Sequence, residues 1–158
     1  MTDTATGQST AASTTRARTN TGRLAVIAAV LSGLLLTNLA IYAIGRALGG
    51  AFTYTQNGST LRVDPVAITI MSLGPLATGL ALIAALSRSW PAAIRVARIA
   101  APTIALATIA VMTIPAGFDT TSTVALATMH LITIPAALLA LNTLPRRHRP
   151  SSRQAPPA

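Results

Sequence analysis

The sequence predicts an all-α membrane protein, an antiparallel four-helix transmembrane bundle with a small extracytoplasmic β-hairpin between the first two helices. Hydrophobic residues make up 51% of the 158 residues, charged residues 9%, and the mean hydropathy is +0.58, whereas soluble domains carry about 25% charged residues. Four apolar runs each reach about 20 residues, the length that crosses about 30 Å of hydrocarbon. The connections between them alternate between arginine-rich and arginine-poor.

The apolar runs define the elements in order. An unpaired backbone amide costs several kcal/mol in lipid, so spans of this length must be helical. Pro75 and Pro135 lie inside the second and fourth runs and predict kinks, because each removes a helical hydrogen bond. Short links make sequential helices pack antiparallel. Within a transmembrane domain of residues 23–144, the predicted helices cover residues 24–45, 66–86, 96–116 and 122–144.

Orientation follows from the arginines. Ten of the 12 lie in the two tails and in the connection between the second and third helices, which four crossings place on one side. Because cytoplasmic flanks are enriched in arginine and lysine, we expect a multi-pass protein of the plasma membrane with both termini cytoplasmic. The residues expected to anchor this topology are Arg23, Arg88, Arg95, Arg98, Arg146 and Arg147.

The segments outside the domain lack apolar periodicity. Residues 1–22 and the basic residues 145–158 are therefore expected to be disordered cytoplasmic tails. A signal peptide is the alternative interpretation of the first helix, since arginines followed by apolar residues describe both. The run from Leu24 exceeds the roughly 7 to 15 residues of a signal core, which favours a retained helix.

The first connection contains a hairpin pattern. Residues from Phe52 alternate toward Asn57-Gly58, and Leu61 and Val63 alternate after that dipeptide. Asn-Gly between alternating residues indicates a two-residue turn. An isolated hairpin is marginal in water, so the side that carries Phe52, Tyr54, Leu61 and Val63 should rest on the bundle. In the third connection, Asp119 is placed to cap the fourth helix.

Polar residues within the spans are the candidate site. Asn38 and His130 each lie about eight residues, or roughly 12 Å, from the outer end of their helices, and Thr108 falls at a similar depth. These three residues form the candidate intramembrane polar layer. One interpretation of His130 is a neutral imidazole that hydrogen-bonds Asn38 or a threonine. The other is a proton relay, haem ligand or substrate contact, although no carboxylate lies at that depth.

Composition limits the chemistry. The chain has no cysteine, lysine or glutamate and only three aspartates, and no residue pattern marks a catalytic, cofactor-binding or metal site. We therefore expect no cofactor and no enzymatic activity. The formal charge of +9 suggests nucleic acid at first. The arginines flank apolar spans, however, which favours the lipid bilayer as their partner and excludes nucleic acid.

Several short motifs carry a family resemblance. They are Asn38-Leu39 with Tyr42, Gly45 and Arg46; the hairpin from Phe52; Asp64-Pro65; Gly74-Pro75; and Asp119-Thr120 leading to Ala127, Met129, His130 and Leu131. Over residues 24–144 the chain resembles an uncharacterised family of small actinobacterial four-helix integral membrane proteins. The resemblance implies a plasma-membrane helical architecture and no particular reaction.

These observations favour a non-enzymatic bundle that associates with itself or with another membrane protein. Small residues at Ala25, Ala29 and Gly33 form a stripe on the first helix that suits close helix packing. The alternative is a small transport or permeation subunit with contacts at Asn38 and His130.

Overall fold

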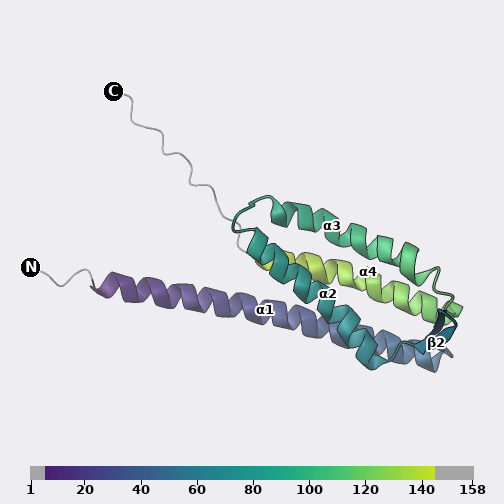
Figure 1. Ribbon diagram of the computed structural model, residues 1–158. Helices are drawn as coiled ribbons and strands as arrows, with labels where there is room; N and C mark the ends of the chain where they lie inside the picture. The colour runs from purple at the N-terminus through teal and green to yellow at the C-terminus, as the bar shows by residue number, and fades with distance from the viewer. Residues whose placement is uncertain (1–5, 145–158) are drawn as a thin grey trace, which may run out of the picture.

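The computed structural model describes the backbone of residues 6–144 and the side chains of residues 21–144. It is mostly helical, with one two-stranded hairpin between the first two helices (Figure 1). Four helical segments are long and apolar enough to cross a membrane, judged by length and composition. The elements are α1 (Thr6–Ala47), β1 (Thr53–Gln56), β2 (Ser59–Arg62), α2 (Pro65–Leu86), α3 (Ala93–Thr108), the π-helix η1 (Ile109–Thr113) and α4 (Thr120–Thr143).

The start of α1 differs from the prediction. The expected disordered tail covered residues 1–22, yet the structure makes residues 6–22 helical and continuous with the apolar run. Apolar periodicity located the part of the helix that can be buried. Helix propagation needs no such periodicity, because each added residue gains a hydrogen bond once the helix is nucleated. The predicted tails at residues 1–5 and 145–158 lie outside the described residues.

The other helix boundaries lie close to those predicted. Helices α2 and α4 begin one and two residues earlier than expected and end within one residue of the predicted ends. Helix α3 begins at Ala93, three residues early, and is continued by η1 only to Thr113, short of the expected residue 116.

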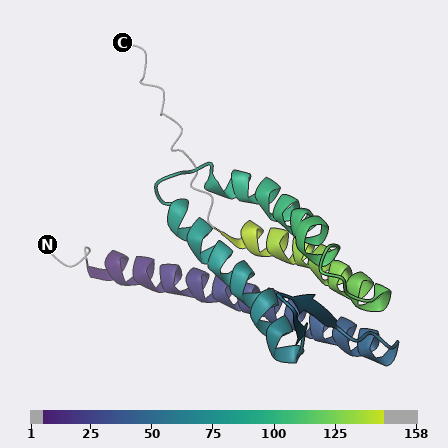
Figure 2. The same cartoon turned by 45° about the vertical axis from the view of Figure 1, so that its right-hand side comes forward.

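The helices run antiparallel in chain order, which defines two ends of the bundle (Figure 1). The hairpin end contains β1, β2 and the beginning of α4, and the turn end contains the α2–α3 connection at residues 87–92. Helix α4 lies between α1 and α3, and the turned view shows the same arrangement (Figure 2). In its most apolar window 39% of the residues are buried, against 11% in each other span, so α4 is the centre of the bundle.

A compact apolar cluster joins the helices near the turn end. Its buried members are Leu80 of α2, Ala97 of α3, and Ala140 and Leu141 of α4. Side chains of α1, among them Ile27 and Val30, pack against the cluster. The small side chains of Ala97 and Ala140 allow α3 and α4 to approach closely, as is usual where helices pack in a membrane.

The hairpin is confirmed. Gln56 pairs with Ser59 across Asn57 and Gly58, whose φ angles of 52° and 77° are both positive, as a type I′ turn requires. Phe52 is fully buried, Tyr54 and Val63 are half-buried, and Leu61 remains 40% exposed. The predicted side therefore rests on the bundle except at Leu61.

Three prolines lie inside helices that continue through them. Pro75 and Pro135 are the predicted positions, and Pro102 of α3 is a third that the sequence reading missed. Each lacks the N–H that would bond the carbonyl one turn earlier. In η1 the N–H of Ile114 donates to the carbonyl oxygen of Ile109, a wider turn than the α-helix. This turn directs Thr113, which is 5% exposed, into the bundle.

The cluster at the turn end makes a stability prediction. Ala140 is fully buried among Leu80, Ala97 and Leu141, so Ala140→Leu should overpack the helix contact and lower the free energy of unfolding by about 1–3 kcal/mol. The measurement is denaturation of the purified protein in detergent. Ala77→Leu, at an exposed position of α2, is the matched control and should leave stability nearly unchanged.

Candidate functional site

The strongest polar arrangement joins α1 to α4 at the hairpin end. Asp119 caps α4 as predicted, because its Oδ1 accepts a hydrogen bond from the Ser122 N–H at 2.9 Å. Its Oδ2 accepts from the Ser122 hydroxyl at 2.6 Å and from the Ala51 N–H at 3.0 Å. The Ser122 oxygen in turn accepts from the Phe52 N–H at 2.9 Å. We call Gly45, Gly50, Phe52, Asp119 and Ser122 the α1–α4 joint.

Two glycines let the backbone come close at this joint. A Cβ added to Gly45 would lie 2.8 Å from Phe52 Cζ and 3.2 Å from the Cβ of Ala125. A Cβ on Gly50 would lie 2.9 Å from the carbonyl oxygen of Gly45 and 3.1 Å from the Ser122 Oγ. Both positions therefore require glycine, because a side chain at either one would keep the end of α1 from contacting the beginning of α4.

Phe52 is the apolar centre of the joint. Its φ of 54° is left-handed, which is rare for a bulky residue, and its side chain is fully buried. The ring stacks at a tilt on Tyr42, with centroids 4.8 Å apart. Arg46 closes the loop by donating from Nη1 to the carbonyl oxygens of Gly50 and Ala51. Burial of the ring and these hydrogen bonds offset the backbone strain at Phe52.

The hydrogen bonds at Asp119 favour its charged form. The Ser122 hydroxyl has the largest effect and the Ser122 N–H the next, with further contributions from the Ala51 and Phe52 N–H groups. Together they outweigh partial desolvation and lower the pKa of Asp119 from its ordinary 3.8 to about 2. The carboxylate therefore stabilises the folded chain at neutral pH.

Asn38 lies deep in the bundle. It is 1% exposed, and its Nδ2 donates to the Ser72 hydroxyl of α2 at 2.8 Å. Its Oδ1 is buried and has no hydrogen-bond partner among the described residues. The side chain therefore links α1 to α2, and its orphan oxygen carries a desolvation cost.

His130 does not use the partners that the sequence suggested. Its Nδ1 lies 2.8 Å from the carbonyl oxygen of Leu126, one turn earlier in the same helix. The ring is half-buried. Neither Asn38 nor a threonine forms a hydrogen bond to it within residues 21–144.

Thr108 is bonded in the same local way, because its Oγ1 donates to the Ile104 carbonyl oxygen at 2.8 Å. The three predicted residues therefore make separate hydrogen bonds and no direct polar network among the described side chains. The sequence reading missed Ser72, the partner of Asn38, and Ser122. For Ser122 the available signal was its position three residues after the predicted cap, Asp119.

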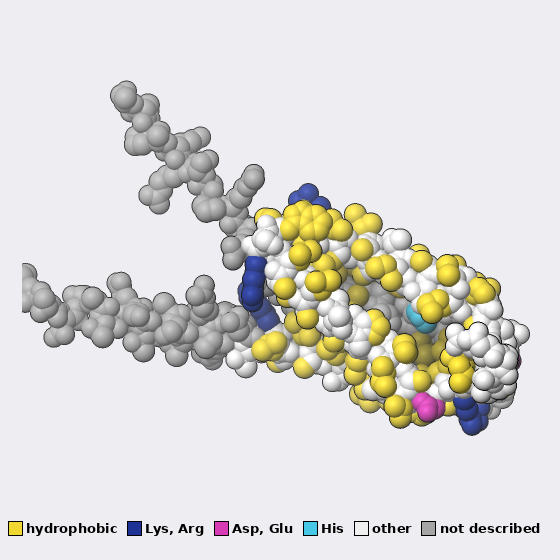
Figure 3. Space-filling model, in the orientation of Figure 1, with side chains coloured by type: hydrophobic (Ala, Val, Ile, Leu, Met, Phe, Trp, Pro, Cys, Tyr) yellow, Lys and Arg dark blue, Asp and Glu magenta, His cyan; other side chains and the backbone are white. Residues whose placement is uncertain are grey.

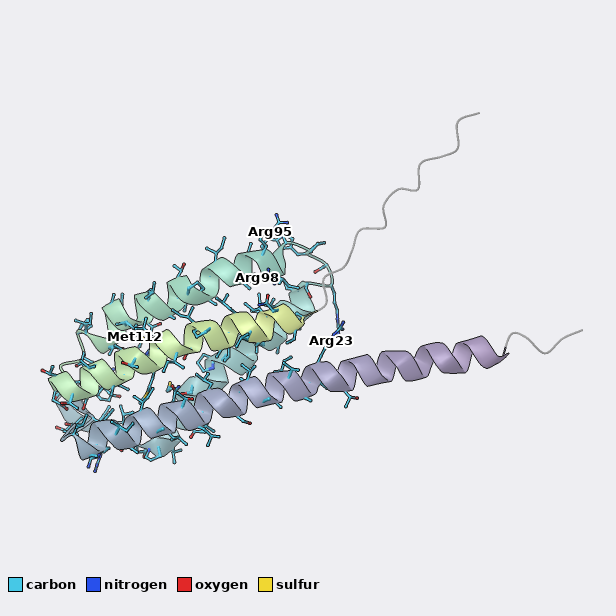
Figure 4. All side chains as sticks on the ribbon, turned by 180° about the vertical axis from the view of Figure 1, so that it is seen from behind. Arg23, Arg95, Arg98 and Met112 are labelled. Atoms are coloured by element: carbon cyan, nitrogen blue, oxygen red, sulfur yellow. The ribbon has the colours of Figure 1, made fainter. Side chains whose placement is uncertain are left out.

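Charge divides between the two ends of the bundle. Arg23, Arg95 and Arg98 lie at the turn end, far from Met112 near the hairpin end (Figure 4). Arg98 donates from Nη2 to the Asn142 Oδ1 and so joins α3 to α4. Dark blue side chains mark both ends of the molecule, and apolar side chains cover its flank (Figure 3). Arg88 follows α2 at the turn end, whereas the predicted anchors Arg146 and Arg147 lie outside the described residues.

Within residues 6–144 there is no group of three or more histidines and carboxylates that could hold a metal ion. The polar groups present can cap helices, link helices and offer isolated hydrogen-bond acceptors. The fold and these polar groups define a class: a small bundle of four apolar helices, each able to span a membrane, with a hydrogen-bonded joint at one end.

The family follows from comparison. The chain belongs to DUF6069, a family of unknown function, whose model matches residues 13–150. This confirms the resemblance to an uncharacterised family. No curated protein and no solved structure matches the chain.

The α1–α4 joint predicts a pH dependence. The pKa of Asp119 is lowered in the folded chain, so its contribution to stability is present above the unfolded value of 3.8 and is lost as the pH falls toward about 2. The melting temperature in detergent should fall over this window. Asp119→Asn should melt lower at neutral pH and lose most of the dependence.

The matched control is Asp64→Asn. Asp64 caps α2 by accepting from the Ala67 N–H at 2.7 Å, away from the joint. This variant should keep the acid-dependent loss of stability, because Asp119 is intact. An unchanged acid profile in Asp119→Asn would contradict the assignment.

Proposed function

We propose that the chain is a multi-pass protein of the plasma membrane with four crossings and both termini in the cytoplasm. The described arginines Arg23, Arg88, Arg95 and Arg98 are at the turn end. Arg46 and Arg62 at the hairpin end are accompanied by Asp64 and Asp119. An excess of arginine on cytoplasmic flanks supports placing the turn end inside the cell and the hairpin outside it. The lipid bilayer is then the principal partner.

We further propose that the protein is not an enzyme and that it associates with itself or with another membrane protein. A composition of three aspartates without glutamate, lysine or cysteine supplies few acids, bases or nucleophiles. The bundle leaves much of each helix exposed. Association of helices is therefore the role that its surface supports best.

The observation that carries this proposal is an open face on α1. Ala25, Ala29 and Gly33 are all exposed, and a Cβ added to Gly33 would meet nothing within 4 Å. The helix contacts α2 and α4 through other residues, including Leu34 and Asn38, which are 3% and 1% exposed. Small residues on an outward face let a second helix approach closely, which is how helices pack in membranes.

The alternative is a small transport or permeation subunit with contacts at Asn38 and His130. A specific observation favours keeping it. Neither the Nε2 of His130 nor the Oδ1 of Asn38 has a hydrogen-bond partner among the described residues. Polar groups within a span mark substrate paths in many membrane proteins. Against it stands the lack of a carboxylate within the four spans, since Asp64 and Asp119 precede α2 and α4.

Self-association is tested at Gly33. Gly33→Leu should weaken dimer formation in bilayers about fivefold, or about 1 kcal/mol, because the larger side chain holds the facing helix away. Energy transfer between labelled copies, followed over a range of protein-to-lipid ratios, measures the equilibrium. Gly79→Leu is the matched control, since Gly79 is also helical with open space around it. A wild-type chain that stays monomeric, and that crosslinks in native membranes to no membrane protein, would overturn the proposal.

A substitution at His130 distinguishes the two proposed functions. If association is the function, His130→Ala should leave proton and potassium flux into proteoliposomes at the wild-type level while the protein still folds. Thr128→Val serves as the control for the loss of a polar group from α4, because Thr128 bonds only its own helix at the Val124 carbonyl oxygen. A flux that is present in wild type, kept in the control and lost in His130→Ala would establish the permeation alternative.

A further inference from the structure

A recess opens between α2 and α3. The two helices meet at the turn end and diverge toward the hairpin end in both ribbon views (Figures 1 and 2). Their mutual contacts are sparse. The space-filling view shows the hollow that this divergence leaves, bordered by apolar side chains (Figure 3). The cyan side chain within it is His130, the one histidine of residues 21–144.

The hydrogen bond inside α4 fixes what this imidazole offers. The Leu126 carbonyl oxygen can only accept, so the Nδ1 at 2.8 Å from it carries the proton. In the neutral ring Nε2 is then an acceptor. No described residue donates to Nε2, and it is not among the buried unpaired atoms. His130 Nε2 is therefore an accessible acceptor in the recess.

The position of this acceptor makes it unusual. His130 is ten residues from the start of α4 and 13 from its end, so it lies near the middle of the span, about 15 Å from the hairpin end. Acyl chains contain no hydrogen-bond donor, so hydrocarbon that filled the recess would leave Nε2 unpaired. An unmade hydrogen bond in such a medium is costly.

We propose that the recess binds a lipid-soluble molecule that has an apolar body and one hydroxyl or N–H group, which donates to His130 Nε2. The apolar border suits the body, and the acceptor selects for the donor. The opening lies on the flank of the bundle, so the molecule enters sideways from the bilayer. The proposal rests on the proposed bilayer placement, but it stands whether or not the chain self-associates or moves solute.

The experiment uses the full chain in lipid nanodiscs and two photoreactive probes, a diazirine-bearing hexadecanol and its methyl ether. The pair differs by a single donor. The alcohol should label the peptides of α2, α3 and α4 that border the recess about fivefold more than the ether. This is the ratio of affinities expected from one hydrogen bond. His130→Leu should reduce alcohol labelling to the level of the ether, whereas Thr128→Val should keep the wild-type difference.

A second variant separates binding from folding. His130→Gln keeps an acceptor on α4 and should retain part of the preference for the alcohol, while circular dichroism checks that each variant is helical. Equal labelling by both probes would overturn the proposal and assign the recess to acyl chains. A preference for the alcohol that persists in folded His130→Leu would also overturn it. If neither probe labels any helix, the bilayer placement fails as well.

Discussion

The contact between the end of α1 and the beginning of α4 sets the register of the bundle. These helices are far apart in sequence, and the α1–α4 joint fixes them through Ser122, Asp119 and the buried Phe52. From the Gly45–Ala125 approach, Asn38 is seven residues back along α1 and His130 five residues along α4. Measured from the level of Gly45 and Ala125, their depths are then about 10 and 8 Å. A slip of one turn at the joint would separate them by about 5 Å more.

Local signals explain what the sequence predicted. Apolar length located the four spans, Asn57-Gly58 located the turn, and Asp119 located the start of α4. The turn and the cap depend on residues within one turn of one another, and apolar length is a property of one continuous segment, so no knowledge of the packing was needed. The helical start at Thr6 was missed because it rests on helix propagation, which leaves no apolar pattern.

Partner choice could not be predicted in the same way. The expected imidazole bond to Asn38 or a threonine competed with a carbonyl oxygen one turn away in the same helix, and the local acceptor prevailed for both His130 and Thr108. Asn38 instead found Ser72 across the helix contact. Depth alone placed these residues at one level. It did not determine their direction, which depends on helix rotation and on the packing of neighbours.

The links between consecutive helices explain where the bundle is open. Helices α2 and α3 are joined by a short turn at residues 87–92 and share the apolar cluster around Leu80 and Ala97. At the hairpin end α2 follows the hairpin, whereas α3 continues through η1 into α4, so no short link holds the two together there. Their separation leaves the hollow that the space-filling view shows on one flank, with the side chain of His130 in it (Figure 3). An unpaired imidazole acceptor thus comes to face the flank because α2 and α3 separate beside it.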